Sequence, residues 1–445
     1  MSRVLLLSPA ALGPRMSGPA VRFYELAKAL AEAGQEPLLA SPEKVDPGFA
    51  SSLPFEAATY NRRSLPAQLA WSEVVVIQGW LLWNHPQVAK AGRPIVADLY
   101  DPIFFETLSQ YDPADYYERI RHNVLLGVVS RTVETGDFFI CASDKQRDLW
   151  LGFMAACNRI NPATYRDDPE FKRLLSVVPF GLPDQPPQKS GPGLRALPGV
   201  GPDDRVVLWN GGVWDWLEPE PLIEAVALLG PAMPDLKLVF MGVKSPDAGL
   251  DESGALTRCR ELVAARGLGG QVIFNDWVAY EQRADFLLEA QVGACLYPPG
   301  VETEYSFRTR LLDCLWAGLP ILCSPGDALS RLVADDDLGA VVRDHEPGTV
   351  AKALEDLLTD PGQAAERRAR CRDLAARLAW SRVAAPLVEF CAVPRLAPDK
   401  MGRFPLRPKA RVPAGYFVRR GLEHLKKGTI FAAVGRFVRR KVKGP

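Results

Sequence analysis

The sequence has 445 residues, of which 47% are hydrophobic and 24% are charged, and its formal net charge at pH 7 is zero. This length exceeds a single ordinary core and predicts two domains of roughly 150–200 residues each, with the composition of a globular protein. No apolar run reaches the roughly 20 residues that a membrane-spanning helix needs, so we expect none.

The first part of the chain alternates short apolar runs with helical patterns. RVLLLSP, at residues 3–9, looks like a weak signal peptide, but a helical pattern follows it directly, so we interpret it as a buried strand. The later runs of this kind are EPLLASP, EVVVIQG, PIVADLY, DFFICAS and SVVPFG. Short buried strands separated by helices predict a parallel sheet with helices on both faces.

Pro and Gly are dense between residues 183 and 204, which is the composition of a linker. After it the pattern restarts with the apolar runs RVVLWNGG, LKLVFMG, QVIFND, VGACLYPP and PILCS. These elements predict an α/β protein with two doubly wound, Rossmann-like domains that face a cleft. We place the domains at residues 1–185 and 186–375, a helix that returns toward the first domain at 376–394, and a tail at 395–445. Ligands of such sheets bind beyond the carboxyl ends of the strands, so polar residues there are the candidates for a site.

The loop after the first strand is longer than such connections usually need. Long loops at this edge of a sheet are often functional, and Arg15, Ser17 and Gly18 would face the cleft from it. A disordered loop is the alternative interpretation.

Two further strand ends of the first domain carry polar residues. The stretch PIVADLYDP places Asp98, Tyr100 and Asp101 at a strand end, where they could orient a sugar hydroxyl, although Asp101 and the proline after it could simply begin a turn. Ser143 follows the run DFFICAS; it is a good N-cap, and capping is its simpler role. Lys145, two residues later, could touch an acidic ligand.

Strand ends of the second domain also carry candidates. Gly211 and Gly212 follow RVVLWN and would let the backbone approach a ligand closely, or would form a tight turn. Asp276, Trp277 and Val278 follow another strand. Trp277 could stack on a base, and a place in the core is an equal alternative.

The segment VETEYSFRTRLLDCLWAGLPI, at residues 301–321, follows a strand of the second domain. We expect a loop first, then a helix with Ser306 as its N-cap. A helix N-terminus offers free N–H groups and partial positive charge, which suits a phosphate. Arg308 and Arg310 would add positive charge in the first turn, where an anion would resolve the unfavourable placement of cations.

Two glutamates, Glu302 and Glu304, precede these arginines by about one helical turn. Either could be the anion in question or could bind the hydroxyls of a sugar. In the alternative interpretation, the glutamates and arginines pair with one another in a surface loop.

Charge is unevenly distributed along the chain, although the net charge is zero. Residues 395–445 hold fifteen Lys and Arg against two Asp and Glu, a charge of +13, so the remainder carries −13. Apolar residues alternate with these cations, which favours basic amphipathic helices on an anionic membrane. A solvated disordered tail is the alternative. Nucleic acid is a less favoured partner, because no reading module accompanies the charge.

Taken together, these features resemble the retaining family 4 glycosyltransferases of the GT-B fold, in a bacterial branch found near polysaccharide clusters. The resemblance in architecture covers roughly residues 1–394 and is sharpest at residues 301–320. The segments SPAALGPRMSGPAVRFYELAKALAEAG, CASDKQRDLWLG and VVPFGLP are similar to first-domain segments of that branch.

The family motif has two glutamates with seven residues between them, followed by a close like Ala-x-Gly-x-Pro; the first falls on Tyr305, with Glu304 one position before it and Glu302 three before. The resemblance implies that Asp313 takes the place of the second glutamate and binds the donor ribose. It implies that Glu302 or Glu304 contacts the transferred sugar and that Phe307 matches the family's phenylalanine. Ser306 stands where the family has glycine, and Thr309 joins the donor-binding set.

The sequence departs from the family at two further places. The family has an Arg and, a few residues later, a Lys after the first strand of the second domain, and these hold the diphosphate; NGGVWDWLEP has neither. Arg308 and Arg310 are then the nearest replacements. The family's frequent His at a first-domain strand end is replaced by the Asp98 to Asp101 segment.

The resemblance implies transfer of a sugar from a nucleotide-diphosphate donor, bound by the second domain, to a glycan or lipid-linked acceptor on the first, with retention. Arg15, Ser17, Gly18, Ser143 and Lys145 would be acceptor-side. We expect no metal and no cofactor beyond the nucleotide-sugar substrate. A nucleotide-sugar epimerase and a non-catalytic GT-B scaffold protein are the alternatives.

The expected location is the cytoplasm, with peripheral binding to the inner face of the cell membrane through the tail. The 8 cysteines are scattered without a Cys-x-x-Cys pair, which favours a reducing compartment and argues against a zinc site.

Overall fold

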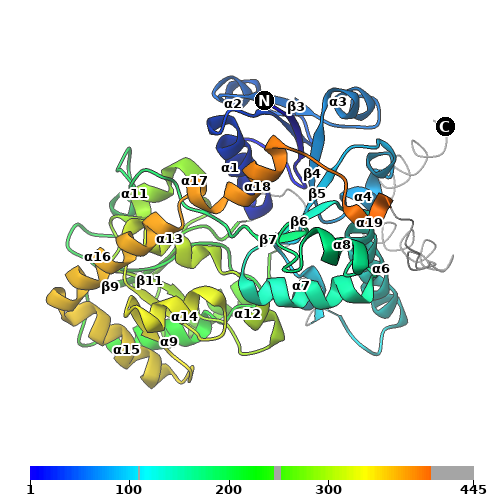
Figure 1. Ribbon diagram of the computed structural model, residues 1–445. Coiled ribbons are helices and arrows are strands. Elements are labelled where there is room, and N and C mark those ends of the chain that lie inside the picture. The colour runs from blue at the N-terminus through cyan, green and yellow to red at the C-terminus, as the bar shows by residue number, and fades with distance from the viewer. Residues whose placement is uncertain (109–110, 245–251, 402–445) are drawn as a thin grey trace, which may run out of the picture.

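Two parallel sheets organise the chain in the computed structural model, which describes residues 1–108, 111–244 and 252–401 (Figure 1). The first sheet has the order β3-β2-β1-β4-β5-β6-β7 and the second the order β10-β9-β8-β11-β12-β13. The strands of the first sheet are β1 (Arg3–Leu7), β2 (Glu36–Ser41), β3 (Glu56–Thr59), β4 (Val74–Gln78), β5 (Ile95–Asp98), β6 (Phe138–Cys141) and β7 (Leu175–Val177). Those of the second are β8 (Arg205–Trp209), β9 (Leu236–Phe240), β10 (Val272–Phe274), β11 (Val292–Cys295), β12 (Ile321–Cys323) and β13 (Gly339–Val341).

Helices connect the strands of each sheet. In the first domain they are α1 (Gly18–Glu32), α2 (Pro47–Ser51), α3 (Leu65–Trp71), α4 (Leu81–Asn84), η1 (Val88–Lys90), α5 (Ile103–Glu106), α6 (Tyr116–Thr135), α7 (Asp144–Ala156) and α8 (Pro162–Asp167). In the second they are η3 (Leu194–Ala196), α9 (Glu220–Leu229), α10 (Gly254–Arg266), η4 (Tyr280–Gln282), α11 (Arg283–Leu287), α12 (Val301–Tyr305), α13 (Thr309–Ala317), α14 (Ala328–Asp335) and α15 (Pro347–Thr359). The chain continues through α16 (Pro361–Arg377), α17 (Trp380–Val383), α18 (Ala385–Ala392) and α19 (Pro398–Met401).

Burial on both faces explains why the strand runs are continuously apolar. Along β1, Val4 and Leu6 enter one hydrophobic cluster while Leu5 and Leu7 enter another, because successive side chains of a strand point to opposite faces. Helices therefore cover both sides of the sheet. The predicted α/β class with two doubly wound domains is confirmed.

The structure corrects the sequence analysis at several elements. Strands β3 and β13 were not predicted, because their short sequences, EAAT and GAV, carry no long apolar run. The expected loop before the arginines is helical, as α12, and Ser306 ends that helix instead of capping the next one. Residues 183–204, which have the composition of a linker, include a segment that packs on the second domain. There Asp285 accepts hydrogen bonds from the backbone N–H groups of Ser190 and Gly191.

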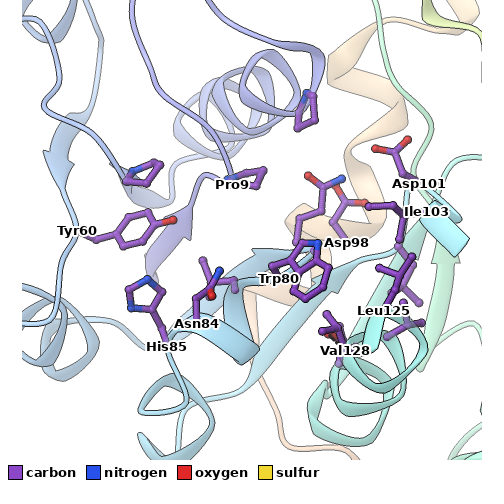
Figure 2. Close-up of a pocket in the computed structure, with 18 of the residues that line it drawn as sticks. Pro9, Tyr60, Trp80, Asn84, His85, Asp98, Asp101, Ile103, Leu125 and Val128 are labelled. Carbon is purple, nitrogen blue, oxygen red and sulfur yellow. Dashed lines mark hydrogen bonds between the residues drawn. The ribbon is translucent and has the colours of Figure 1, made fainter. Parts of the chain in front are cut away.

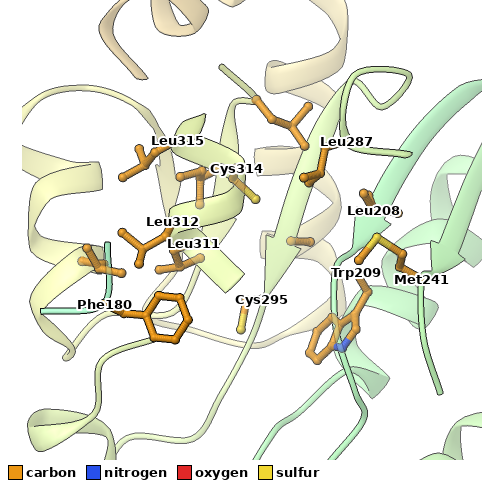
Figure 3. Close-up of a cluster of buried hydrophobic side chains, with 14 of the residues drawn as sticks. Phe180, Leu208, Trp209, Met241, Leu287, Cys295, Leu311, Leu312, Cys314 and Leu315 are labelled. Atoms are coloured by element: carbon orange, nitrogen blue, oxygen red, sulfur yellow. The ribbon is translucent and has the colours of Figure 1, made fainter. Parts of the chain in front are cut away.

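Helix α13 is fixed by the hydrophobic cluster beneath it. Leu311, Leu312, Cys314 and Leu315 are buried from this helix, and Figure 3 shows them in one cluster with Trp209 at the end of β8 and Cys295 at the end of β11. Gly318 ends the helix in the left-handed conformation, with φ of 66°, where glycine is the favoured residue. The first turn of α13 is thereby held at the carboxyl edge of the second sheet.

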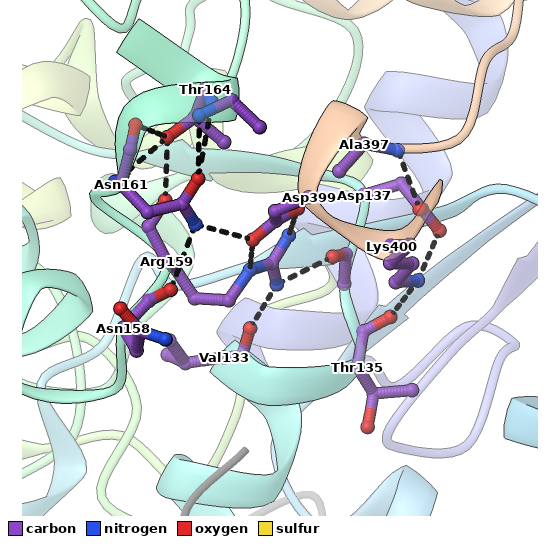
Figure 4. A network of polar contacts seen from close by, with 12 residues as sticks. Val133, Thr135, Asp137, Asn158, Arg159, Asn161, Thr164, Ala397, Asp399 and Lys400 are labelled. Carbon is purple, nitrogen blue, oxygen red and sulfur yellow. Dashed lines mark hydrogen bonds and ion pairs between the residues drawn. The ribbon is translucent and has the colours of Figure 1, made fainter. Parts of the chain in front are cut away.

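The last described helices return to the first domain. Phe390 of α18 stacks on Phe138 of β6 with ring centroids 4.6 Å apart. Asp399 of α19 forms a buried ion pair with Arg159, with Oδ2 and Nε 2.6 Å apart, in the network that Figure 4 shows. Most of the predicted basic tail, residues 402–445, lies outside the described residues. Among the described residues, none of the helices has both the length and the apolar character to cross a membrane.

Candidate active site

The segment around α12 is one of the places where the two domains touch. The side-chain amide of Gln146, on α7, donates hydrogen bonds to the carbonyl oxygens of Tyr100 and Tyr305, at 2.9 and 2.8 Å. The Tyr100 hydroxyl donates to the carbonyl oxygen of Phe307 at 3.3 Å, and the two rings meet edge to face. The predicted Tyr100 and Phe307 are thus brought together, and this contact holds the approach to α13 against the first domain.

Glu302 and Arg308 form a half-buried ion pair. Arg308 Nη2 lies 2.6 Å from Glu302 Oε2, and the guanidinium lies 4.7 Å above the ring centroid of Tyr297. The Ser306 hydroxyl donates to the Glu302 carbonyl oxygen at 2.9 Å and also contacts its carboxylate. Arg308 is 8% exposed, so this pair is held in one geometry.

Glu304 faces the solvent instead. Its carboxylate pairs with Lys145 of the first domain at 2.7 Å, and the two side chains are 54% and 42% exposed. The predicted acceptor-side lysine and one of the two candidate glutamates therefore bind each other. The structure separates the two glutamates that the sequence left in competition, and Glu302 is the one turned inward.

Within the described residues, Arg310 has no carboxylate as an ion-pair partner. Its Nη1 is buried and has no hydrogen-bond partner, and its guanidinium lies 5.4 Å from the ring centroid of Trp209. Gly211 makes room for it, because a Cβ at that position would meet the guanidinium at 3.3 Å. Burial lowers the pKa of Arg310, and the positive charge of Arg308 acts in the same direction.

The backbone around Arg310 is fixed from β8. The Asn210 amide donates to the Arg310 carbonyl oxygen at 2.7 Å. Helix α13 begins with Arg308 as its N-cap and without a side-chain hydrogen bond to its first turn. The first turn of α13 thus carries Arg310, whose guanidinium lies beside Trp209 and Gly211, and the N-terminal N–H groups of a helix suit an anion.

Carboxylates gather on the other side of Glu302. Burial, and then the charge of Glu106, raise the pKa of Asp101 well above its usual range, and Glu302 contributes in the same direction. Burial first and the charge of Glu302 second raise the pKa of Glu106 to about 7, against the effect of Arg308. Asp101, Glu106 and Glu302 thus form an acidic cluster, in which Glu106 can accept or release a proton near neutral pH.

Asp98 is occupied by a structural partner. Arg22 of α1 is fully buried; its Nε lies 2.6 Å from Asp98 Oδ2, and its Nη2 lies 3.2 Å from Oδ1. Asp98 Oδ1 also accepts the N–H of Tyr100. This pair positions the strand end that carries Asp101. No contact here tests the predicted catalytic role of Asp98.

Asp313 is also paired. Arg283 Nε lies 3.0 Å from its Oδ1, and the arginine stacks over Tyr280 and Trp316 at 3.7 and 4.5 Å. The Tyr280 hydroxyl in turn donates to Glu25 of α1 at 3.2 Å. Asp313 therefore lies on the side of the helix that faces the first domain, and its predicted contact with a ribose stays a prediction.

The loops after β8 and β10 hold the remaining donor-side candidates. Gly212 accepts the indole N–H of Trp209 at 3.2 Å. Asp276 pairs with Lys244 at 2.5 Å, and both side chains lie on the surface, with exposed fractions of 64% and 66%. Trp277 has a buried indole N–H without a partner, and Val278 packs against the core.

The acceptor-side candidates are placed as follows. Ser143 accepts the N–H of Gln146 at 3.2 Å and so caps α7, its simpler predicted role. Ser17 stands at the N-cap position of α1 without a side-chain hydrogen bond, and Gly18 is the first residue of that helix. Arg15 is exposed in the preceding loop.

Three residues of this region were missed by sequence reasoning: Arg22, Glu106 and Gln146. Arg22 follows Val21 in a helix that looked like an ordinary amphipathic one. Glu106 and Gln146 lie on helices whose placement depends on the tertiary fold. A charged residue amid the apolar positions of α1 was the one available signal. Within the described residues, no group of three or more His, Cys, Asp or Glu side chains could hold a metal ion.

Comparisons with known proteins agree with this geometry. Residues 202–377 match the family model of the glycosyl transferases group 1. A D-inositol 3-phosphate glycosyltransferase from Streptomyces avermitilis is 32% identical over 186 residues, which are 40% of this chain and 38% of the relative. The matched part thus spans well under half the length of that curated relative.

Solved structures extend the likeness to nearly the whole chain. The Anabaena protein HepE, in complex with UDP-glucose, has a TM-score of 0.61 at 16% identity, covering 88% of this chain and 100% of that one. Sucrose-phosphate synthase from Thermosynechococcus elongatus has a TM-score of 0.57 at 18% identity, covering 88% and 98%. At these identities the likeness shows the GT-B fold alone. The family match over residues 202–377 supports the resemblance to family 4-type glycosyltransferases, and the bacterial branch stays a prediction.

Proposed function

We propose that this chain, a member of the group 1 glycosyltransferases with the GT-B fold, transfers a sugar from a nucleoside-diphosphate donor to an acceptor hydroxyl with retention of anomeric configuration. The donor would lie on the second domain, at the carboxyl ends of β8, β10 and β11. The acceptor would lie on the first domain. The observation that carries this proposal is the unpartnered Nη1 of Arg310 at the start of α13.

A diphosphate would pair with the positive charge of Arg310 at the start of α13. An unpartnered buried polar group costs roughly 1–3 kcal/mol, and more when it is charged, so an anion there would gain affinity. The first-turn N–H groups of α13 would add hydrogen bonds. Arg310, with Arg308 beside it, thereby takes the role of the basic pair that the loop after β8 lacks.

The proposed step breaks the bond between the anomeric carbon and the diphosphate oxygen. The acceptor oxygen forms the new bond to that carbon, and the acceptor's proton passes to a carboxylate of the acidic cluster. The leaving diphosphate keeps the electron pair, and Arg310 stabilises its negative charge. Glu302 is held by Arg308 and Ser306 and would contact the transferred sugar, which lies between the diphosphate and the acceptor.

Substitution of Arg310 tests the donor site. We expect Arg310→Ala to weaken binding of the cognate nucleotide-sugar by about tenfold or more, since a charge-assisted contact is lost. Its thermal stability should be unchanged or higher, because an unpartnered buried cation is removed. Donor affinity is measured by calorimetry after a thermal-shift panel of UDP-, GDP-, dTDP- and ADP-sugars has named the base.

Arg266→Ala is the matched control. Arg266 pairs with Glu224 on the surface of α10 and is 55% exposed, so its loss should leave donor affinity unchanged. Equal donor affinity in Arg310→Ala and the parent chain would remove Arg310 from the site. Failure of every nucleotide-sugar to bind would favour a scaffold protein, and an epimer formed without acceptor would favour an epimerase.

We propose further that the basic tail holds the chain on an anionic membrane surface, where a glycan or lipid-linked acceptor would be at hand. The support is the sequence of residues 402–445, in which cations and apolar residues alternate. Metal independence remains part of the proposal, since the arginine and helix N-terminus supply the positive charge that a metal would otherwise bring.

A further inference from the structure

A cavity of about 500 Å³ lies in the first domain at the carboxyl edge of its sheet. Its walls include Gln78 at the end of β4, Asp98 at the end of β5, and residues of α6 such as Val128. Figure 2 shows Tyr60 and His85 on one side of it and Asp101 and Ile103 on the other. The volume falls in the range of sites that hold a small molecule.

Most of the wall is apolar because its aromatic residues have used their polar atoms elsewhere. The Tyr60 hydroxyl donates to the carbonyl oxygen of Ser8 at 2.9 Å, and burial raises the pKa of Tyr60 to about 12. The Trp150 indole N–H donates to the carbonyl oxygen of Leu99 at 3.0 Å. These rings, with the aliphatic side chains of α6, therefore offer apolar faces to whatever fills the cavity.

The side chain of Gln78, which lines the cavity, has a polar atom without a hydrogen-bond partner among the described residues. Gln78 is 6% exposed, and its side-chain oxygen is buried without a hydrogen bond. Such an acceptor calls for a donor, such as a hydroxyl, from the occupant. Asp101 supplies a second acceptor at the far end of the cavity, within electrostatic reach of Glu302.

The lining of the cavity offers a phosphate no permanent positive charge. Asp98 and Asp101 line it, and no lysine or arginine does so within the described residues. The nearest buried cation, Arg22, is already bound to Asp98 and to the carbonyl oxygens of Val178 and Pro179. A phosphate in this cavity would lose its hydration without gaining a counter-charge.

We infer that this cavity binds an uncharged acceptor, with an apolar body against the aromatic and aliphatic walls and a hydroxyl that donates to the side-chain oxygen of Gln78. A phosphorylated polyol fits poorly, because no lysine or arginine of the described residues lines the cavity. This inference rests on the proposed function and names the acceptor class of the same reaction. It sets the chain apart from relatives whose names include D-inositol 3-phosphate.

The geometry leads from the cavity to the donor site. Asp101 lines the cavity and belongs to the acidic cluster with Glu302. Phe105, two residues beyond Ile103, stacks on Tyr305 of α12 with ring centroids 5.3 Å apart. An acceptor hydroxyl at the Asp101 end would therefore point toward the place where we put the transferred sugar.

Binding without donor tests the inference directly. The probes are the 4-nitrophenyl glycosides of glucose, galactose and mannose, with D-myo-inositol 3-phosphate as the charged alternative, titrated into the full chain by calorimetry. We expect at least one neutral glycoside to bind, and inositol phosphate to bind at least tenfold more weakly or not at all. Tighter binding of inositol phosphate, or no binding of any neutral glycoside, would overturn the inference.

Two variants locate the binding. Val128→Trp fills the cavity from α6, and Asn123→Trp places the same ring on the exposed face of that helix as a control. Gln78→Leu removes the unpartnered oxygen and should leave the fold at least as stable. We expect glycoside affinity to fall at least fivefold in Val128→Trp and in Gln78→Leu, and to stay unchanged in Asn123→Trp.

If Val128→Trp fails to fold, Gln78→Leu still decides the matter, since unchanged glycoside affinity in it would contradict the assigned hydrogen bond. The donor experiments with Arg310→Ala fail independently of these. Glycoside binding without any nucleotide-sugar binding would reject the proposed transfer and keep the cavity as a site for a neutral ligand. Donor turnover without glycoside binding would keep the proposed transfer and reject the cavity as the site of a neutral acceptor.

Discussion

Glu302 and Glu304 stand two positions apart on one short helix, yet their carboxylates meet different surroundings. Glu302 turns to Arg308 and Ser306 at the domain contact, whereas Glu304 pairs with Lys145 in solvent. Surface pairs of the second kind contribute about 0–1 kcal/mol. The sequence could not distinguish the two glutamates. The residues of α12 alone do not determine which face of that helix meets the first domain.

Arg308 and Arg310 show the same dependence on surroundings. The sequence predicted both as phosphate ligands, with pairing to a glutamate as the alternative. The structure realises the alternative for Arg308, which binds Glu302, and leaves Arg310 without an acid. A cation buried without a counter-charge is unfavourable unless a ligand completes it, so the second arginine carries the proposal of a donor site.

Glu106 makes stability depend on pH. Its pKa is about 7 in the fold against an ordinary 4.5, so between these values the unfolded chain loses a proton that the folded chain keeps. Stability therefore falls as pH rises through this window; the penalty is full above pH 7 and absent below pH 4.5. We expect Glu106→Gln to raise the free energy of unfolding at pH 8, by up to about 3 kcal/mol, and to change it little at pH 4.5.

Denaturant titrations at the two pH values measure the Glu106 effect. Glu304→Gln is the control, because its carboxylate is exposed and should give the same small change at both pH values. A Glu106→Gln chain whose stability difference from the parent is the same at pH 4.5 and pH 8 would contradict the assigned pKa.

At the scale of elements, Arg22 ties together three parts of the first domain. It lies on α1, binds Asp98 at the end of β5, and donates to the carbonyl oxygens of Val178 and Pro179 just after β7. Helix and strands far apart in the sequence are thereby locked at the edge of the sheet where the cavity opens. All three guanidinium nitrogens of Arg22 have hydrogen-bond partners, which is the condition for a buried charge to be tolerated.

We expect Arg22→Met to destabilise the first domain by roughly 3–5 kcal/mol, because it leaves the Asp98 carboxylate buried without a counter-charge. The double variant Arg22→Met, Asp98→Asn should recover part of that loss. Arg258→Met is the control, since its pair with Glu220 is largely exposed and should contribute less than about 1 kcal/mol. Denaturant unfolding gives the three values, and equal losses in the single and double variants would show that the ion pair is not the cause.

At the scale of the whole molecule, the chain crosses from the second domain back to the first near its end. Leu182 and Ala379 form a parallel bridge between the two crossing segments, and Trp380 packs on Phe180. Beyond α18, Asp399 neutralises the buried Arg159, as Figure 4 shows. The predicted tail from residue 395 thus has a first part that belongs to the first domain.

This anchor decides where the tail can be removed. A chain cut after Pro394 loses Asp399 and leaves Arg159, which is 1% exposed, with carbonyl partners only. We expect that cut to lower stability by about 3 kcal/mol or more, and a cut after Met401 to leave it unchanged. Thermal unfolding of the two shortened chains, with Asp399→Asn in the full chain as a point control, measures the difference.

The cut after Met401 then tests the membrane proposal on an intact fold. We expect the full chain to float with anionic vesicles and the shortened chain to stay behind, with the difference lost at high salt because the attraction is electrostatic. Equal flotation of the two chains would show that the tail is not the anchor.

The sequence by itself determined the α/β class and the two doubly wound domains, because buried parallel strands must be continuously apolar and a helix must follow each one. Its motif at residues 301–320 indicated the resemblance to GT-B glycosyltransferases. It also marked the strand ends as the candidate region. Only the tertiary structure decided which charged residues pair with which. Glu302 with Arg308, Asp98 with Arg22 and Asp399 with Arg159 join segments whose distance in the chain ranges from 6 to 240 residues. Such pairing depends on burial and geometry that no local pattern encodes, and the same holds for the cavity beside Gln78.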